Sequence, residues 1–162
     1  MKFALPFELG MLASSIFASN TTTVSPSIYI LSTSPPATMA LGKALDTLGY
    51  SRLDLGSDVL DHAALSNTYA EVTSNMQLAE ITRSQPDAKF ILPRGNLRIG
   101  EEDYVLSARD FFSEQKRSSK FLELDVLALK TSSQAENWVQ LCDFLGMGYS
   151  VVERLGLWHF PK

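Results

Sequence analysis

The sequence is short of the residues that build metal centres, disulfides and membrane spans. Its 162 residues include one cysteine and two histidines, so it cannot form an intrachain disulfide or a multi-cysteine zinc site. No apolar run approaches the ~18–20 residues that cross a membrane, so no transmembrane segment is expected. Basic residues are also few. The 14 lysines and arginines against 18 aspartates and glutamates give a net charge of -4, which argues against a broad nucleic-acid-binding surface.

The amino-acid composition is typical of one globular domain. Hydrophobic residues make up 45% of the chain and charged residues 20%, which is enough apolar material for a core. The length of 162 residues falls in the usual single-domain range of roughly 100–200. Seven prolines and nine glycines are too few for a collagen-like or low-complexity chain. We therefore expect one folded domain.

The first 26 residues resemble an incomplete leader. Lys2 precedes an apolar stretch that ends in small residues, as in a secretory signal peptide, but Pro6 and Glu8 interrupt that stretch. A glycosylation triplet at residues 20–22 would matter only in an exported chain. We expect an N-terminal arm or weak leader over residues 1–26, a folded domain over residues 27–162, and a cytoplasmic location, with secretion as the alternative.

Short apolar runs alternate with helical patterns along residues 27–162. Strands are predicted at residues 27–32, 88–92 and 121–126. Helices are predicted at residues 37–48, 58–84 (with a break near 66–67), 101–117 and 133–145. A capping box at residues 133–136 is expected to begin the last helix, and Gly146 to end it. This alternation predicts an α/β fold with three layers, a mainly parallel sheet between flanking helices. Ligands bind such sheets beyond the carboxyl ends of the strands.

The loop after the first predicted strand lies where the N-terminus of a helix could hold a phosphate. Phosphate loops use glycine for close approach and a basic residue for charge. This loop has Pro35, Pro36 and Ala37 and contains no base, and its prolines lack amide donors. Taken alone, it is interpreted as a strand-to-helix turn with Thr38 near the start of the helix.

Several stretches resemble the sulfotransferase family of P-loop proteins, in the pattern of its small fungal members. The matching segments are residues 28–50 (first strand, loop and helix), 86–94 (a strand ending in arginine), 121–126 with 138–146 (last strand and helix), and 158–161 (an aromatic tail with proline). Together they cover most of residues 27–161. The run at 141–146 is the most specific, but it belongs to a core helix and carries no chemistry.

The resemblance implies transfer of a sulfuryl group from 3'-phosphoadenosine-5'-phosphosulfate to a hydroxyl of a small metabolite. It implies that Ser34 and Thr38 hold the 5'-phosphosulfate and that Arg94 meets the 3'-phosphate. Within the family's loop pattern only Thr38 is retained, and Pro35 stands where a basic residue is typical. The stretch over residues 50–86 is also shorter than in members of that family, which carry acceptor-binding helices and a further strand there. A reduced domain, or a gene model lacking a segment, would explain this.

Other residues could take part in catalysis or binding, but each also has a simpler structural interpretation. His62 is the candidate general base, because an imidazole is partly neutral at pH 7; a solvent-facing histidine is the alternative. Arg98 could join Arg94 in an anion clamp, since guanidinium groups match phosphate geometry. Cys142 lies on the apolar face of a predicted helix and is expected to be buried and inert. His159, between two aromatic residues, is interpreted as a packed tail residue.

Two acidic side chains share one side of a predicted strand. Glu123 and Asp125 are two residues apart, and alternate residues of a strand face the same way. Buried without a cation, they would have raised pKa values and be candidates for acid/base chemistry. This hypothesis belongs to a reaction without a sulfuryl donor.

The sequence leaves two functions open. The first is a small sulfotransferase that binds 3'-phosphoadenosine-5'-phosphosulfate through Ser34, Thr38 and Arg94. The second is a protein of the same fold that has lost the donor site and performs cofactor-free chemistry on a specialised metabolite, or only binds one. In both, the expected partner is a small molecule, and neither nucleic acid nor metal is expected.

Overall fold

A computed structural model describes residues 27–32, 34–54, 67–95 and 101–162. Five strands form one sheet, namely β1 (Ile28–Leu31), β2 (Ser51–Arg52), β3 (Thr68–Val72), β4 (Lys89–Arg94) and β5 (Phe121–Asp125). Their order is β2-β3-β1-β4-β5, and every neighbouring pair is parallel. The predicted parallel sheet is therefore confirmed. The expected arm over residues 1–26, His62 and Arg98 lie outside the described residues.

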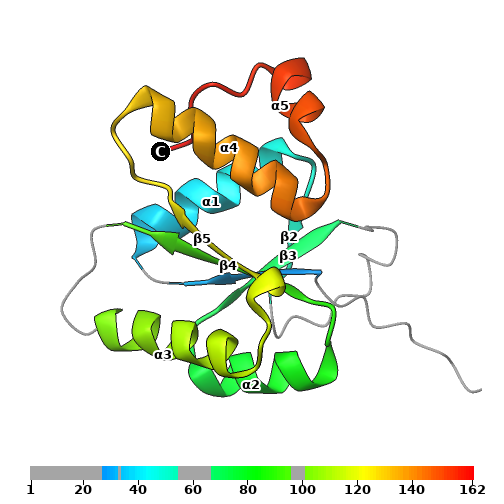
Figure 1. Ribbon diagram of the computed structural model, residues 1–162, viewed down its shortest axis with the longest axis vertical. Helices are drawn as coiled ribbons and strands as arrows, with labels where there is room; N and C mark the ends of the chain where they lie inside the picture. The colour runs from blue at the N-terminus through cyan, green and yellow to red at the C-terminus, as the bar shows by residue number, and fades with distance from the viewer. Residues whose placement is uncertain (1–26, 33, 55–66, 96–100) are drawn as a thin grey trace, which may run out of the picture.

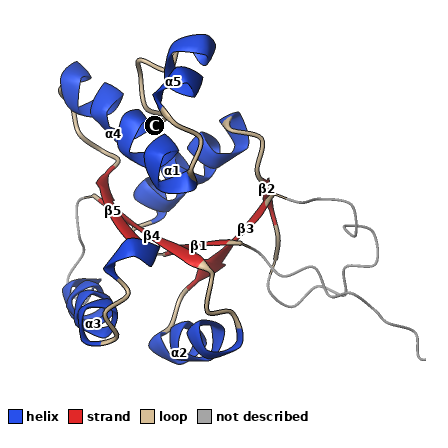
Figure 2. Cartoon of the chain, turned by 45° about the vertical axis from the view of Figure 1, so that its right-hand side comes forward, coloured by secondary structure: helices blue, strands red, loops and turns tan. Residues whose placement is uncertain are grey.

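Helices cover both faces of the sheet. The helices are α1 (Pro35–Thr47), α2 (Asn75–Ser84), α3 (Glu101–Glu114), α4 (Thr131–Leu145) and α5 (Tyr149–Leu155), with a 3₁₀ turn, η1 (Ser118–Lys120), before β5. Figure 1 shows α1, α4 and α5 on one face and α2 and α3 on the other. Figure 2 shows the sheet between these two groups. The three-layer α/β architecture follows, as predicted from the alternation of strands and helices.

Two cores lie on the two faces of the sheet, and β1 contributes to both. Ile28 and Ile30 pack in the core that contains Trp138 of α4, whereas Tyr29 and Leu31 pack in the core that contains Phe112 of α3. A parallel strand in the middle of a sheet is covered on both sides, so a continuous apolar run is its typical sequence. This explains why β1 and the apolar part of β4 could be predicted.

The helix predicted over residues 58–84 is wrong in its middle part. Residues 68–72 form β3, and the helix at this place is α2, residues 75–84. Ser74 begins α2 because its hydroxyl accepts a hydrogen bond from the amide of Gln77. The β-prone Tyr69 and Val72 pair with β1, and Thr68 pairs with Ser51 of β2. All three are buried, and this non-local pairing overrides a local helical pattern.

One further prediction of a helix boundary needs correction, and one is confirmed. The capping box at residues 133–136 is wrong, because α4 begins earlier with Lys130 as its N-cap and the amide of Gln134 already bonds to the Lys130 carbonyl. The predicted end at Gly146 is confirmed, and its φ of 79° suits glycine. Among the described helices, none has the length and apolar character of a membrane span.

Candidate functional site at the carboxyl edge of the sheet

The adjacent strands β1 and β4 lead to opposite faces of the sheet. β1 is followed by α1 on one face and β4 by α3 on the other (Figure 1). In open parallel sheets, such a divergence leaves a crevice beyond the carboxyl ends of the strands where ligands bind. Ser34 and Thr38 follow β1, and Arg94 ends β4. The fold therefore brings the predicted site segments to this one edge.

Three hydroxyl groups gather at the N-terminus of α1. Ser34 is the N-cap residue, yet its side chain makes no capping hydrogen bond. Within the described part of the chain, its Oγ is a buried side-chain oxygen with no hydrogen-bond partner. The Thr38 Oγ1 lies 3.3 Å from the Ser32 Oγ. Ser34 and Thr38 both lie at this N-terminus, and both side chains are buried, at 3% and 5% exposure.

The first turn of α1 does not fit a phosphosulfate group well. Pro35 and Pro36 occupy its first two positions and have no amide hydrogen to donate. The amide of Thr38 is already bonded to the Ser34 carbonyl at 3.0 Å. Ala37 is the one remaining amide donor of the turn beyond Ser34 itself, and the described residues of the loop include no lysine or arginine. This helix N-terminus therefore has few amide donors for an anion and no basic side chain among its described residues.

Gly95 shows how closely neighbouring segments pack on this turn. A Cβ atom at Gly95 would lie 2.8 Å from the Leu127 Cδ1, 3.1 Å from the Ala37 Cβ and 3.2 Å from the Ser34 Oγ. Those distances are shorter than ordinary contacts, so only glycine fits here without movement of its neighbours. Gly95, which follows Arg94, therefore packs closely against both the first turn of α1 and Leu127 of the loop after β5.

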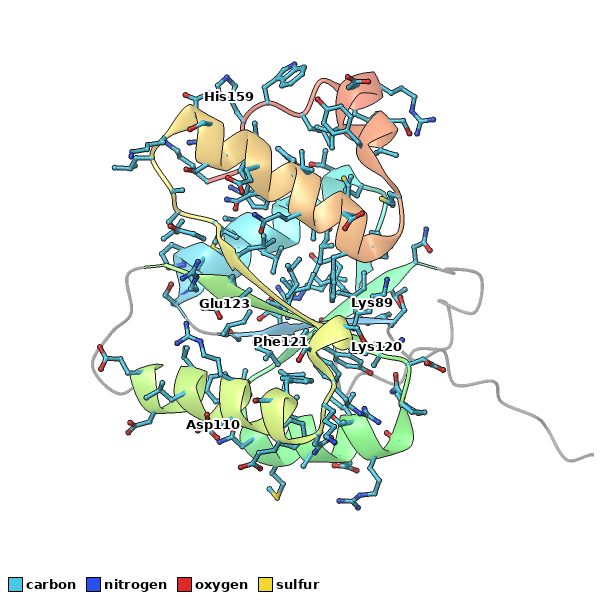
Figure 3. The ribbon with its side chains drawn as sticks, viewed as in Figure 1. Lys89, Asp110, Lys120, Phe121, Glu123 and His159 are labelled. Atoms are coloured by element: carbon cyan, nitrogen blue, oxygen red, sulfur yellow. The ribbon has the colours of Figure 1, made fainter. Side chains whose placement is uncertain are left out.

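Arg94 makes a different contact from the one that the resemblance implies. Its Nε lies 3.1 Å from the Glu123 Oε1. Arg109 of α3 donates from Nε to the Glu123 Oε2 at 3.0 Å and from Nη2 to the Glu123 Oε1. Figure 3 labels Glu123 at the side of the sheet that faces α3. Two guanidinium groups thus converge on one carboxylate and leave one net positive charge.

The exposures of these side chains differ. The Arg94 side chain is 51% exposed and that of Arg109 41%, whereas Glu123 is 22% exposed. The hydrogen bonds to Glu123 raise the pKa of Arg109 above its usual value, so this guanidinium stays charged at any physiological pH. The two arginines are thus about half exposed at the carboxyl edge of the sheet, where an anion from solution can reach them.

Sequence reasoning missed Arg109. Val105, Ala108 and Phe112 are the buried residues of α3, and their helical spacing places Arg109 beside the sheet-facing stripe. The position of Arg109 on the predicted helix could therefore have indicated a second arginine near the sheet. The condition for acid/base chemistry at Glu123 is not met, because two cations contact it, and Asp125 is exposed.

The remaining candidates lie outside this cluster. Cys142 is fully buried, and burial raises the pKa of its thiol, which agrees with an inert cysteine. His159 is exposed, so its interpretation as a packed tail residue is wrong, and its Nδ1 lies 3.4 Å from the Gln134 Oε1. Within the described residues, no three histidine, cysteine or acidic side chains are grouped so as to hold a metal ion.

Comparison of the chain with protein-family models, with curated proteins and with solved structures gives no match. Function is therefore inferred from the geometry at the carboxyl edge of the sheet.

Proposed function

We propose that this chain binds a small anionic metabolite at the carboxyl edge of β4 and β5, with Arg94 as the principal contact. The observation that carries the proposal is the convergence of Arg94 and Arg109 on Glu123 at that edge. A guanidinium presents planar donor pairs that match phosphate and sulfate oxygens. This is the second of the two functions that the sequence leaves open, in its binding form.

The exposure of the two arginines supports an anionic ligand. Arg94, Arg109 and Glu123 together carry one positive charge, which the exposed Asp125, the register partner of Arg94, offsets. Recognition would therefore depend on direct contacts with the guanidinium groups rather than on the overall charge of the cluster. The Arg94 and Arg109 side chains are 51% and 41% exposed, so a ligand from solution can reach them.

Sulfuryl transfer from 3'-phosphoadenosine-5'-phosphosulfate is the second candidate function. The observation that favours it is the buried Ser34 Oγ, which has no hydrogen-bond partner among the described residues, at the N-terminus of α1, in the position where the resemblance places the 5'-phosphosulfate. Arg94 would then meet the 3'-phosphate. Binding takes precedence over transfer because the first turn of α1 has two prolines and offers no cation.

Calorimetric titration of the full chain with adenosine 3',5'-bisphosphate tests the proposal. We expect saturable binding that weakens about tenfold or more in Arg94→Ala, because a hydrogen-bonded charge contributes about 1.5–3 kcal/mol. Arg52→Ala is the matched control. Arg52 lies on the far edge strand, β2, is also about half exposed, and also pairs with a glutamate, Glu71, at 3.2 Å.

Two results would contradict the proposal. One is the absence of heat at millimolar ligand from a protein shown to be folded by circular dichroism. The other is an equal loss of affinity in Arg94→Ala and Arg52→Ala, which would indicate attraction by overall charge rather than a site. Acceptor-dependent release of adenosine 3',5'-bisphosphate from the phosphosulfate donor, abolished in Arg94→Ala, would instead establish the second candidate function.

A further inference from the structure

The outer side of α3 carries a hollow that the proposed anion site does not use. Its volume is about 460 Å³, and its lining residues all belong to α3, namely Asp103, Leu106, Ser107, Asp110, Phe111 and Glu114. The sheet-facing side of the same helix is formed by Val105, Ala108 and Phe112, which are buried. Figure 3 shows Asp110 pointing away from the sheet. This α3 hollow therefore opens to solvent.

A row of carboxylates lies beside apolar side chains in the α3 hollow. Asp103, Asp110 and Glu114 are exposed, and the helix rises roughly 16 Å from the first to the last of them, at about 1.5 Å per residue. Leu106 is 53% exposed, and Phe111 is partly buried. The surface thus offers both negative charge and apolar contact area to a partner.

The positions of these carboxylates do not all suit the helix that carries them. Asp103 lies in the first turn of α3, where a negative charge favours the helix dipole. Asp110 and Glu114 are four residues apart, a spacing at which like charges repel on a helix surface. Glu114 is also the last residue of α3, and the last turn contains no basic residue, so its charge opposes the dipole.

These charges have no counter-charge in the protein that would offset their cost. Among the described residues, the ion pairs do not include Asp103, Asp110 or Glu114. Local arrangements that cost stability are expected at functional sites, where a partner compensates for them. The α3 hollow therefore has the features of a surface that receives a cationic partner.

We infer that the α3 hollow docks a basic amphipathic helix of a partner protein, with lysines or arginines on Asp103, Asp110 and Glu114 and an apolar side chain on Leu106. Charge complementarity selects this partner, because nucleic acids and anionic membrane surfaces carry the same sign of charge as the hollow. A helix presents basic and apolar side chains at the three- and four-residue spacings of α3 itself, so its cations can meet the carboxylates in order.

A second copy of this chain does not supply such a helix from its described part. Each described α-helix contains at most one lysine or arginine, whereas three carboxylates line the hollow. The inference is also independent of the anion site. Arg109 contacts Glu123 of β5 and so lies on the side of α3 that faces the sheet, away from the hollow.

The other face of the molecule provides matched controls. Glu136 and Asp143 of α4 and Glu153 of α5 are exposed acidic residues, and Figure 1 shows α4 and α5 across the sheet from α3. Their conversion to amides removes the same charge as the conversion of the three acids of the hollow. Leu155 of α5 is 48% exposed, close to the 53% of Leu106, so Leu155→Ala matches Leu106→Ala.

The test is a fluorescence-anisotropy titration of a labelled synthetic amphipathic helix of lysine and leucine with the full chain at physiological salt. We expect saturable binding by the wild type. Combining Asp103→Asn, Asp110→Asn and Glu114→Gln should weaken it about tenfold or more, and Leu106→Ala about threefold or more. The triple amide variant of α4 and α5 and Leu155→Ala should each change the affinity by less than about twofold.

A stability measurement separates docking from a structural role. The variant with Asp110→Asn and Glu114→Gln loses charges that oppose α3, so we expect its urea unfolding midpoint to rise while its affinity for the peptide falls. A fall in both would indicate that these side chains support the fold and would overturn the inference.

Four further outcomes would overturn it. The first is no saturable binding by the folded wild type. The second is an equal loss of affinity in the two triple variants, which would indicate attraction by overall charge. The third is equal binding of a control peptide with serine in place of leucine. The fourth is a wild-type dimer in sedimentation that Leu106→Ala dissociates, which would assign the hollow to a second copy. None of these results bears on anion binding at Arg94.

Discussion

Tyr104 and Tyr69 show how burial sets the chemistry of single residues. The Tyr104 hydroxyl of α3 donates to the carbonyl of Val72, the last residue of β3, at 3.3 Å, and burial raises its pKa to about 12. Burial raises the pKa of Tyr69 to about 12 as well, with a further contribution from Asp46, which accepts its hydrogen bond at 3.1 Å. Both phenols therefore act as neutral donors at physiological pH.

These raised pKa values predict a loss of stability in alkali. An unfolded tyrosine ionises near pH 10, so the stabilisation from each folded phenol is complete below about pH 10 and is lost as the pH rises toward 12. We expect the free energy of unfolding, measured with urea at intervals from pH 9 to pH 12, to fall with pH. Tyr104→Phe should fall less steeply than the wild type. Equal slopes for the two proteins would contradict this expectation.

The C-terminal segment, residues 157–162, packs on α4 and α1. Leu157 and Phe160 are buried, and the Phe160 ring lies 4.9 Å from the Trp138 ring of α4. The Trp138 Nε1 donates to the His159 carbonyl at 3.1 Å, and the Lys43 Nζ of α1 donates to the Lys162 carbonyl at 2.7 Å. This segment therefore packs into the core through Leu157 and Phe160.

A pair of substitutions in this segment tests its contribution. Phe160 is 3% exposed and Trp158 is 51% exposed, so two aromatic residues two positions apart differ in burial. We expect Phe160→Ala to lower the free energy of unfolding by about 3 kcal/mol through loss of buried contacts. Trp158→Ala should change it by less than about 1 kcal/mol. Equal effects in denaturant titrations would show that the segment does not pack as described.

The elements differ in how well the sequence predicts them, for physical reasons. β1 is a central strand covered on both faces, so its apolar run is visible locally. The edge strand β2 has two residues, Ser51 and Arg52, and carries no pattern. β3 was misread because Thr68 and Tyr69 become a strand through pairing with segments distant in sequence.

The candidate site was also predictable only in part. Arg94 follows from the resemblance and from its place at the end of an apolar strand. The contact between Arg109 and Glu123 joins a helix to a strand, so it depends on the packing angle between them, which spacing in the sequence does not specify. The close packing of Gly95 against Ser34 and Leu127 likewise joins residues that only the folded sheet brings together.

At the scale of the whole molecule, the strand order decides where a ligand can bind. β1 and β4 are neighbours in the sheet but lead to helices on opposite faces (Figure 1). Two regions meet at their carboxyl ends, the buried hydroxyl groups at α1 and the half-exposed arginines at α3. We propose that the second region, rather than the first, recognises an anion.

The most direct test is nuclear magnetic resonance of the ¹⁵N-labelled full chain, recording arginine Nε–H and backbone amide signals during titration with adenosine 3',5'-bisphosphate. We expect the Nε–H signals of Arg94 and Arg109 to shift in a saturable way, with that of Arg52 unchanged and the amides of Ala37 and Thr38 little affected. Shifts at the amides of Ala37 and Thr38 with Arg94 and Arg109 unchanged would contradict the claim and place the anion at α1.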